Sequence, residues 1–445
     1  MLSELSYFIK ETSVTIRAKV LHVELSESIP GLPLDPDYEK TYVVFWWHGV
    51  PLGHQEIDAV QLPMPATQLA NLAVQAITPA VGNQLLPKNF KAPLSEHFEH
   101  QPQTAAPDFQ SLLALEHPLG QLGERWSKHV DEALNETVSI VICTRNRPEF
   151  LAKCLHALQN LSHPAQEIIV VDNAPHTDET RQLVSQIPGI RYVPEPRPGL
   201  SVARNTGIRH STGNIIAFTD DDVIVHPDWI ARLRQSFQNP KVMAVTGLIL
   251  PAELETEAQL IFEVDLGNFG WGYHTKIFDQ AFFQATKHVG VPVWRIGAGA
   301  NMAFRRQAFE MVGTYDERLG AGASGCSEDS ELWYRILAEG WLCRYEPTAV
   351  VFHHHRGDLK GLRQQMYQYM RGHVVALLIQ FHRYKHWGNL LRLFVILPGY
   401  YALVFLRGLL RGFGFRHRTY LAEVMGCVAG IKFYLQRCTL SQDGL

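Results

Sequence analysis

Ile215-Ile216-Ala217-Phe218-Thr219-Asp220-Asp221-Asp222 is the stretch of sequence that decides the fold. Its apolar first half is typical of a strand that is buried on both faces of a parallel sheet. Three carboxylates follow at the point where this strand ends. Because ligands of open α/β sheets gather beyond the carboxyl ends of the strands, these acids are the first candidates for a functional site.

The acids after this strand indicate a divalent cation. Mg²⁺ and Mn²⁺ prefer oxygen ligands, and two aspartates separated by one residue, Asp220 and Asp222, can address a cation together with a ribose or a diphosphate. The alternative is an acidic turn that is exposed to solvent. Three like charges after a buried strand repel one another unless a cation compensates them, which favours the metal site.

Three further apolar segments of the same kind lie upstream, at 138–143, 167–172 and 190–193. Helix-length segments such as 147–161 separate them. This alternation of short Ile- and Val-rich strands with amphipathic segments predicts a parallel sheet that is covered by helices on both faces.

Polar residues end the first two of these strands. Thr144, Arg145 and Asn146 follow the first strand, and Asp172 ends the second. Asp172 can accept a hydrogen bond from a base N–H, while Arg145 or Arg147 can meet a phosphate. Taken alone, Asp172 is better explained as a helix N-cap or turn residue. The repetition of the pattern at several strand ends favours nucleotide binding.

A Pro/Gly turn, Pro196-Arg197-Pro198-Gly199, opens a helix that carries Arg204 and Asn205. A helix N-terminus beside a guanidinium suits an anion such as a diphosphate. Such turns also precede helices for purely structural reasons, so both interpretations stay open.

In their order, these segments resemble the family 2 glycosyltransferases of GT-A fold. The family's motifs are Thr-x-Asn, Val-Val-Asp, Gly-Leu-Ser-x-Ala-Arg-Asn and Asp-x-Asp, followed by a Gly/Ala-rich Asn segment and a Glu-Asp pair. The resemblance covers 138–355, about half of the chain, with motifs at 144–146, 170–172, 199–205, 220–222, 297–305 and 327–332.

The resemblance implies an α/β fold of the GT-A nucleotide-diphospho-sugar transferase type, with a mostly parallel sheet and helices on both faces. It also implies transfer of a sugar from a nucleotide-diphosphate sugar to a glycan or lipid-linked acceptor, with inversion at the anomeric carbon. The implied cofactor is a divalent cation, Mn²⁺ or Mg²⁺, which neutralises the departing diphosphate. The residues implied to bind the nucleotide sugar are Thr144, Arg145, Asn146, Asp172, Arg204, Asn205, Asp220 and Asp221.

The resemblance makes Asp329 the expected catalytic base on the acceptor hydroxyl, with Glu328 as its neighbour and the second choice. The alternative is that both acids merely open the helix 329–338, because acids favour the first turn of a helix. The other motifs of the family favour the catalytic interpretation.

Histidines complete the metal site in some members of the family, and three of them follow the apolar run 350–352. His353 is preferred because it stands first after this run, and His355 is nearly as suitable. The expected metal ligands are therefore Asp220, Asp222 and His353. A surface histidine cluster and contacts to the diphosphate are the alternatives.

Acceptor binding is expected at Gly299, Asn301 and Trp294. Trp294 and the aromatics among glycines at 267–273 can stack on the C–H face of a sugar. A mobile loop with a packed anchor explains the segment 267–273 equally well.

The flanking regions differ in character from the catalytic domain, 138–355. Residues 1–86 alternate in strand fashion and predict a β-rich accessory module, and 87–137 is interpreted as a linker. Residues 356–445 predict a helical, basic tail with 13 Lys and Arg against 3 Asp and Glu, whereas the rest of the chain has 27 against 41.

The tail contains 14 consecutive uncharged residues, 393–406, which are interrupted by Pro398-Gly399. This run falls short of the roughly 18 apolar residues of a spanning helix. Interfacial or re-entrant contact with an anionic membrane is therefore expected. The alternative is a buried hairpin packed on the catalytic domain. Nucleic acid is not expected as a partner, because the tail is too apolar and lacks a recognisable binding fold.

The six cysteines show neither zinc-site spacing nor disulfide density, and the N-terminus lacks the pattern of a cleaved signal peptide. A cytoplasmic location, peripheral at the cytoplasmic face of the membrane, is expected. The favoured function is synthesis of a polysaccharide, glycolipid or other glycoconjugate. The alternatives are a sugar nucleotidyltransferase, whose Gly-rich, Lys-containing phosphate loop is not seen after the first strand, and a non-catalytic nucleotide-sugar- or lipid-binding protein.

Overall fold

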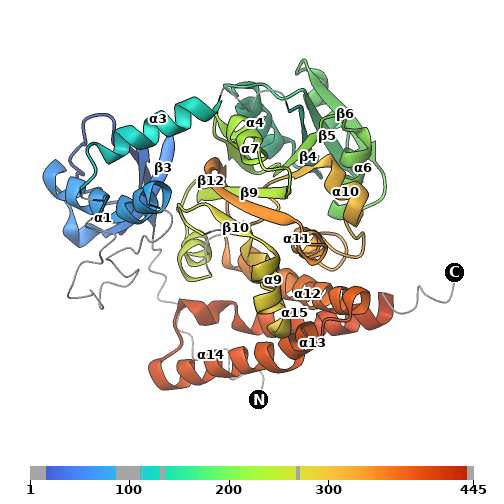
Figure 1. The fold of residues 1–445 in the computed structure, drawn as a ribbon. Coiled ribbons are helices and arrows are strands. Elements are labelled where there is room, and N and C mark those ends of the chain that lie inside the picture. The colour runs from blue at the N-terminus through green and yellow to red at the C-terminus, as the bar shows by residue number, and fades with distance from the viewer. Residues whose placement is uncertain (1–16, 87–110, 113, 131–135, 267–270, 438–445) are drawn as a thin grey trace.

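The computed structural model describes residues 17–86, 111–112, 114–130, 136–266 and 271–437. Three parts follow one another along the chain: an N-terminal three-stranded sheet with a helix, a central sheet covered by helices, and a set of C-terminal helices (Figure 1).

The N-terminal module is a sheet of β1 (Ala18–Glu24), β2 (Lys40–Trp47) and β3 (Val50–Asp58). β1 pairs with β2 in parallel, and β2 pairs with β3 in antiparallel fashion. The turn between β2 and β3 is formed by His48 and Gly49, both with positive φ, as type I′ hairpin turns require. Helix α1 (Ala66–Leu85) packs on β3.

This module packs directly against the central domain. The backbone N–H of Ala18 donates to the carbonyl of Leu254 over 2.9 Å, and the hydroxyl of Tyr38 donates to Glu255 over 2.8 Å. The ring of Trp46 stacks on that of His226 with 5.6 Å between the centroids. Buried hydrophobic residues of the module and of one face of the central sheet belong to one continuous core.

The segment predicted as a linker, 87–137, contains helix α3 (Pro118–Val130). This helix contacts α1 and α7 (Trp229–Ser236), and Trp126 Nε1 donates to Gln84 over 3.1 Å. The segment is therefore partly helical, while 87–110, 113 and 131–135 lie outside the described residues. The boundaries of the domains stay predictions.

The central sheet has the order β10-β12-β9-β11-β7-β4-β5-β6, with β8 paired to β12. All four segments predicted as strands form its parallel half, β7-β4-β5-β6. In the other half, β11 runs antiparallel between β7 and β9, and β12 runs parallel to β9. The bounds are β4 (Val138–Thr144), β5 (Glu167–Asn173), β6 (Ile190–Glu195), β7 (Ile215–Asp220), β8 (Val223–Val225), β9 (Val242–Pro251), β10 (Lys276–Phe278), β11 (Asn301–Arg305) and β12 (Leu342–His353).

Helices cover both faces of this sheet (Figure 1). Alternate residues of β4 belong to two separate buried clusters, Val141 to one and Ile140 to the other, so both faces are buried, as Ile- and Val-rich parallel strands require. A Cβ at Gly207 would lie 2.3 Å from Val141, so glycine lets α6 approach β4 closely. The α/β fold is thereby confirmed. The covering helices are α4 (Pro148–Gln159), α5 (Glu179–Ser185), α6 (Leu200–His210), α7, α10 (Arg306–Val312) and α11 (Glu328–Ala338).

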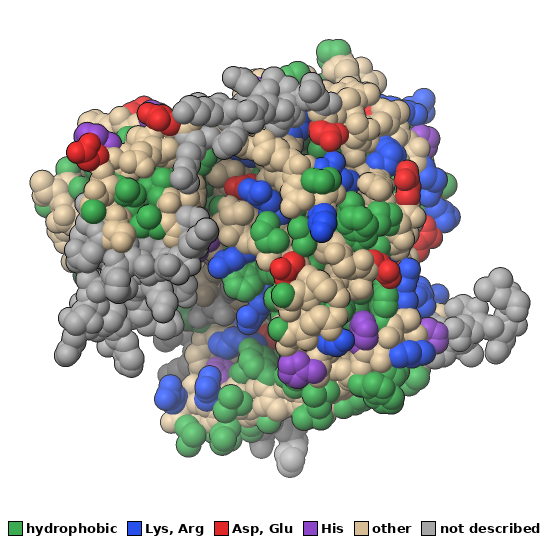
Figure 2. All heavy atoms as spheres, viewed as in Figure 1, with side chains coloured by type: hydrophobic (Ala, Val, Ile, Leu, Met, Phe, Trp, Pro, Cys, Tyr) green, Lys and Arg blue, Asp and Glu red, His purple; other side chains and the backbone are tan. Residues whose placement is uncertain are grey.

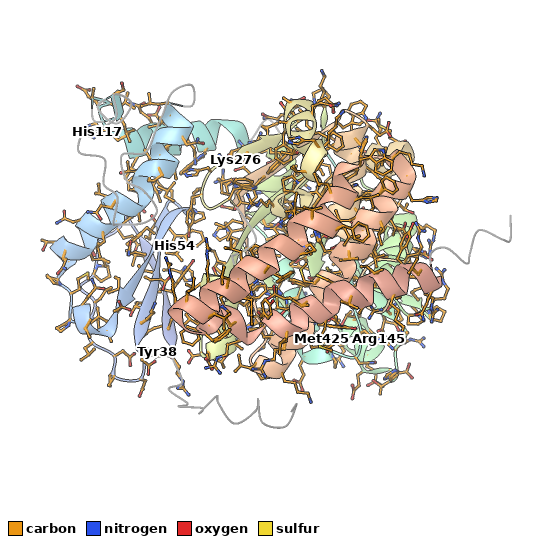
Figure 3. All side chains as sticks on the ribbon, turned by 90° about the horizontal axis from the view of Figure 1, so that it is seen from below. Tyr38, His54, His117, Arg145, Lys276 and Met425 are labelled. Atoms are coloured by element: carbon orange, nitrogen blue, oxygen red, sulfur yellow. The ribbon has the colours of Figure 1, made fainter. Side chains whose placement is uncertain are left out.

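The tail is helical, as predicted, and consists of α12 (Leu359–Tyr384), α13 (Gly388–Leu391), a π-helical turn (Arg392–Ile396), α14 (Leu397–Arg411) and α15 (Tyr420–Arg437). α12 and α15 pack along each other. Figure 3 shows the tail helices from below, where they lie across the central domain, with Met425 labelled on α15.

The prediction that Pro398-Gly399 interrupts the apolar run is wrong. Residues Gly388–Arg411 form one continuous helix of 24 residues, with Pro398 in the first turn of α14. Pro398 supplies no N–H to the helix. The π-helical turn Arg392–Ile396 lies just before it and changes the hydrogen-bond pattern there, so the helix continues. By length and composition, this is the one helix among the described residues that is able to cross a membrane, a test that core helices of soluble proteins also pass.

Candidate active site

The three acids at the end of β7 lie in different environments. Asp221 and Asp222 are buried, whereas the side chain of Asp220 is 34% exposed. Thr144, at the end of the neighbouring β4, donates its hydroxyl to Asp221 Oδ2 over 2.8 Å. Burial raises the pKa of Asp221 to about 7. The predicted meeting of the first and fourth strand ends is thus observed.

Arg147 offsets the negative charge of two of these acids. Its Nη1 donates to Asp221 Oδ1 over 2.6 Å, and its Nη2 donates to Asp222 Oδ2 over 2.8 Å. From the sequence, Arg147 was a candidate for contact with a phosphate. In the structure, its guanidinium binds two protein carboxylates. This bidentate contact lets like charges gather after a buried strand.

Asp222 faces His353. The buried Oδ1 of Asp222 makes no hydrogen bond in the described structure and lies 3.4 Å from Nε2 of His353, the last residue of β12. Burial opposes ionisation of Asp222, but His353 and Arg147 outweigh it and hold the pKa of this carboxyl below its usual range.

The protein alone does not enclose a metal ion. Within the described residues, no three or more His, Cys, Asp or Glu side chains converge as a metal site. Mg²⁺ commonly binds through one or two carboxylates together with substrate phosphates and water, so a partial set is the chemistry expected for such a cation.

His355 lies next to His353 but has a different partner. Its Nδ1 is 3.0 Å from His353 Nδ1, and its Nε2 is 3.1 Å from Glu263 Oε2. Burial lowers the pKa of His355. Of the two histidines considered from the sequence, His353 is therefore the one whose ring faces the acids.

Asp172 is a buried carboxylate at the end of β5. Its Oδ2 accepts a hydrogen bond from the hydroxyl of Tyr192 over 2.9 Å, while its Oδ1 is buried without a partner among the described residues. Burial raises the pKa of Asp172. An unused acceptor at a strand end suits a base N–H and differs from the N-cap interpretation.

The other residues after β4 lie at the surface. Arg145 and Asn146 are exposed, and Asn146 has a positive φ of 54°. Its side-chain oxygen accepts from the backbone N–H of His176 over 2.9 Å. Asn146 thus joins the loops after β4 and β5, and the predicted nucleotide contacts of Arg145 and Asn146 stay predictions.

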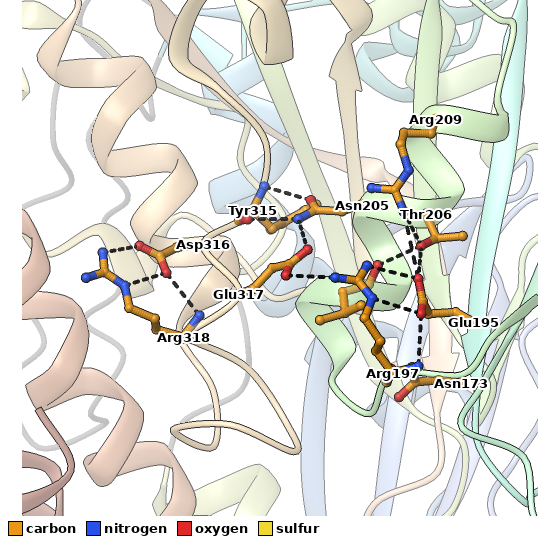
Figure 4. A network of polar contacts seen from close by, with 11 residues as sticks. Asn173, Glu195, Arg197, Asn205, Thr206, Arg209, Tyr315, Asp316, Glu317 and Arg318 are labelled. Atoms are coloured by element: carbon orange, nitrogen blue, oxygen red, sulfur yellow. Dashed lines mark hydrogen bonds and ion pairs between the residues drawn. The ribbon is translucent and has the colours of Figure 1, made fainter. Parts of the chain in front are cut away.

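A polar network fixes the Pro/Gly turn before α6 (Figure 4). Asn173 donates to the carbonyl of Arg197 over 2.7 Å and accepts from the N–H of Gly199 over 2.9 Å. Glu195 accepts from both the backbone N–H and the guanidinium of Arg197, and from the hydroxyl of Thr206 over 2.6 Å. Gly199 has a φ of 137°, which only glycine adopts readily.

Asn205 belongs to the same network. It donates to the carbonyl and accepts from the N–H of Tyr315, both over 2.9 Å, and a second donor contact reaches Glu317 over 3.3 Å (Figure 4). Asn205 therefore holds the segment after α10, and its predicted contact with the nucleotide sugar stays a prediction.

Arg204 connects the acids of β7 to the Glu-Asp pair of α11. Its buried guanidinium donates to Glu328 Oε1 over 2.5 Å and to Asp220 Oδ1 over 3.3 Å. It also contacts the carbonyl of Gly299 over 3.4 Å, and a Cβ at Gly299 would lie 2.6 Å from Nη2. Gly299 thus leaves space for this arginine.

The two acids at the start of α11 differ in burial and therefore in their access to a substrate. Glu328 is buried beside Arg204, and burial raises its pKa to about 7 in spite of that charge. Asp329 is only partly buried, and its Oδ1 accepts from the N–H of Ser330 over 2.6 Å. Burial also raises the pKa of Asp329. Asp329 is the better placed of the two to meet a substrate.

The residues predicted for acceptor binding are spread out. Asn301 is fully buried, where it accepts from Trp229 Nε1 over 2.8 Å and donates to two strand carbonyls, Leu248 and Ala349. These bonds place Asn301 in the core between strands, and its contact with an acceptor stays a prediction.

Trp294 packs against the tail. Its ring contacts that of His373 on α12, and the guanidinium of Arg392 lies 3.9 Å from its centroid. Trp294, Ser327 and Ser330 line a cavity of about 10 Å³, room for about one water molecule. Residues 267–270 of the expected aromatic loop lie outside the described residues.

Sequence reasoning missed several side chains that support the site. Tyr192 holds Asp172, and Glu263 with Tyr42 lies behind the histidines. Each comes from a distant part of the chain, and no local sequence pattern marks it. Glu263 and His355, for example, are 92 positions apart, so their contact is seen only in the folded structure.

The comparisons with known proteins show the family of the chain. The model of the glycosyl transferase family 2 matches residues 139–313. The succinoglycan biosynthesis protein ExoM of Rhizobium meliloti is 30% identical over 49% of this chain and 67% of its own length. The glucosyl-dolichyl phosphate glucuronosyltransferase of Haloferax volcanii is 27% identical over 41% of this chain and 57% of its own length, so only part of that relative is spanned.

A solved structure is also similar to the chain. The mannosyltransferase PcManGT from Pyrobaculum calidifontis, in complex with GDP-Man and Mn²⁺, is 16% identical, with a TM-score of 0.46 over 70% of this chain and 96% of the other. From the family model and the relative in Rhizobium, the chain belongs to glycosyltransferase family 2 and is a glycosyl-transferring enzyme.

Proposed function

We propose that this enzyme transfers a sugar from a nucleoside-diphosphate sugar to a hydroxyl of a glycan or lipid-linked acceptor, with inversion at the anomeric carbon. The observation that carries this proposal is the bridge formed by Arg204 between Asp220 and Glu328. It brings the acids that suit the donor diphosphate to the same place as Asp329, an acid that suits the acceptor.

The residues proposed for the donor lie at neighbouring strand ends. Asp172 offers the unused Oδ1 to a base N–H, and Asp220 presents a partly exposed carboxylate at the end of β7, on the other side of β4. Thr144 and Asp221 hold each other, so we assign them to shaping the nucleotide site.

The proposed cation is Mn²⁺ or Mg²⁺, held by Asp222 and His353 with help from Asp220. The facing atoms of Asp222 and His353 fit such an ion, and the donor diphosphate would complete its ligands. When bound, the cation supplies positive charge to the diphosphate as it departs.

Asp329 is the proposed base. In the displacement, the acceptor oxygen forms a bond to the anomeric carbon while the bond from that carbon to the diphosphate breaks. The proton of the acceptor hydroxyl passes to Asp329, and the nucleoside diphosphate leaves with the electron pair. The raised pKa of Asp329 makes it a stronger base than an exposed aspartate.

A nucleotide-release assay tests the function. Candidate donors are first screened by thermal stabilisation with Mn²⁺ or Mg²⁺, since a ligand that binds the folded state raises the melting temperature. The stabilising donor should then release its nucleoside diphosphate in the presence of acceptors, and Asp222→Ala should abolish the release. Asp37→Ala, an exposed change in the N-terminal module, is the control. Full turnover in Asp222→Ala would overturn the assignment, and metal-dependent donor binding without any nucleotide release would indicate a binding protein.

We also propose that the tail lies on the cytoplasmic face of an anionic membrane. Large hydrophobic side chains are exposed along α14 and the following turn, and they gather at the lower edge of the molecule in Figure 2. Arg407 and Arg411 are exposed on α14, which suits anionic headgroups, whereas Arg416 and Arg418 pair with Glu423 and Glu257. One relative is named for a dolichyl-phosphate-linked sugar, so a lipid-linked acceptor is consistent with this surface.

Vesicle sedimentation tests the membrane surface. Leu410 is 77% exposed on α14, and Val60 is 93% exposed in the N-terminal module. Leu410→Asp should reduce binding to vesicles that contain phosphatidylserine, while Val60→Asp should bind as the wild type does. Equal binding by the wild type and Leu410→Asp would contradict an apolar contact through α14.

A further inference from the structure

We infer that the N-terminal module positions the metal-binding histidine: Tyr42 and Glu263 orient His355, and His355 orients His353. This inference rests on the proposed metal site and gives the accessory module a part in it. Tyr42 lies on β2 of the module, whereas the three other residues belong to the central domain. His353 is the proposed metal ligand. The other three are positioning residues and do not touch the cation site.

The four side chains form one continuous chain of polar contacts. The hydroxyl of Tyr42 donates to Glu263 Oε1 over 3.4 Å. Glu263 Oε2 is 3.1 Å from His355 Nε2, and His355 Nδ1 is 3.0 Å from His353 Nδ1. The chain ends at Asp222, whose Oδ1 is 3.4 Å from His353 Nε2.

This chain orients the ring of His353. The ring of His355 is held at both nitrogens, by Glu263 at Nε2 and by His353 at Nδ1. The contact at Nδ1 of His353 leaves its Nε2 directed at Asp222. A partner on one ring nitrogen is the usual way in which a protein orients the other nitrogen of a metal-binding histidine.

The relation of His353 to Asp222 agrees with that orientation. His353 Nε2 and Asp222 Oδ1 face each other over 3.4 Å, and Asp222 Oδ1 makes no hydrogen bond in the described structure. A cation would accept both atoms as ligands.

Glu263 lies in an unusual backbone segment. Residues Ile261–Asp265 form a π-helical turn, a feature that occurs frequently at functional sites. Glu263 and His355 are both buried, and an isolated buried carboxylate is costly. His355 offsets part of this cost from within the central domain, and Tyr42 adds its contact only while the N-terminal module is docked.

Binding of Mn²⁺ alone, followed by electron paramagnetic resonance of the free ion, tests the inference without turnover. Glu263→Ala should weaken Mn²⁺ binding about 10-fold, the lower end of the effect of removing a direct partner of a metal-binding histidine, because Glu263 acts on His353 through His355. Glu263→Gln keeps a carbonyl acceptor for His355 and should restore most of the affinity. Tyr42→Phe should weaken binding less than Glu263→Ala does, because its hydrogen bond is long.

The matched control is Tyr38→Phe. Tyr38 also donates from the module to a glutamate of the central domain, Glu255, but it has no part in the chain to His353. Figure 3 labels Tyr38, just before β2, and His54 on β3; their side chains contact Glu255 and Tyr273 of the central domain. Mn²⁺ binding by Tyr38→Phe should equal that of the wild type; a loss as large as in Glu263→Ala would overturn the inference in favour of general loosening of the interface.

The remaining outcomes separate this inference from the proposed function. If Asp222→Ala binds Mn²⁺ as the wild type does, the proposed metal site itself is wrong. If Asp222→Ala loses Mn²⁺ but a folded Glu263→Ala retains it, only the positioning inference is wrong. Should Glu263→Ala not fold, Glu263→Leu combined with His355→Phe replaces both partners by apolar groups, which proteins tolerate better than one unpaired polar group. Wild-type Mn²⁺ affinity in that double variant would likewise overturn the inference.

Discussion

Arg204 and Glu328 form a buried ion pair in which Nη1 lies 2.5 Å from Oε1. The pair joins α6, which follows the Pro/Gly turn, to α11, which carries the proposed base. Its partners come from positions 124 apart, so the pair also ties two distant parts of the central domain together.

Breaking this pair should cost stability. Arg204→Met leaves Glu328 buried without a compensating charge, which typically destabilises a protein by about 3–5 kcal/mol. We expect urea unfolding to show this loss, and Arg204→Met combined with Glu328→Gln to recover part of it. Additive effects of the two changes would contradict a direct coupling.

Gly299→Ala should disturb the same arginine from the other side. The new Cβ would lie 2.6 Å from Arg204 Nη2, and the guanidinium is held between two carboxylates and cannot shift freely. We expect kcat to fall while the protein remains folded. Gly357→Ala, where a Cβ meets no atom within 4 Å, is the control and should behave as the wild type.

Asp329→Asn should lower kcat by about 10²- to 10⁴-fold, the range for loss of a general base. The amide keeps the shape of the side chain, so donor binding measured by calorimetry should change little. Unchanged kcat would exclude Asp329 as the base and direct attention to Glu328.

The pH dependence of kcat should report the same group. Burial raises the pKa of Asp329 above its ordinary value of about 3.9, and a base must be unprotonated to act. The rate should therefore fall as the pH decreases through this raised pKa. The hydroxyl of Ser330 lowers the pKa of Asp329, so Ser330→Ala should move the acid limb to higher pH; a shift to lower pH would be inconsistent.

Glu195→Gln should destabilise the protein in a pH-dependent way. Burial alone would raise the pKa of Glu195, but hydrogen bonds from Arg197 and Thr206 hold it at about 2. Since an unfolded glutamate has a pKa of about 4.3, this stabilisation is present above about pH 4 and is lost as the pH falls toward 2. Urea midpoints of the wild type and Glu195→Gln should therefore converge at low pH.

The control for this measurement is Glu317→Gln. Glu317 is about half exposed and contacts the same arginine, Arg197, over 3.4 Å. Exposed ion pairs contribute little, so its urea midpoint should stay near that of the wild type at every pH. A constant difference between wild type and Glu195→Gln would contradict the linkage.

The parallel half of the sheet could be predicted because each strand carries its own signal. Ile215–Asp220 has the same bounds in sequence and structure, and the other three strands differ only at their ends. The antiparallel β11 gave no such signal, because its pairing between β7 and β9 depends on partners far away in the chain.

The residues of the site likewise divide into those that the sequence predicts and those that depend on distant partners. The strand-end acids could be found from the sequence because motif and strand are adjacent. The partner of Arg147 could not be found, because a guanidinium can serve a phosphate or a carboxylate and only the fold decides between them. The helix through Pro398 was misjudged because a local rule about proline ignores the π-helical turn before it.

The clamp of Arg147 on Asp221 and Asp222 bears on how the enzyme matures. Because a resident guanidinium offsets part of the negative charge of the acids, the newly made chain is expected to fold without a metal. Under the proposed function, the ion is then needed for turnover. Metal supply would limit the speed of such an enzyme, whereas the amount of folded protein in the cell would be independent of it.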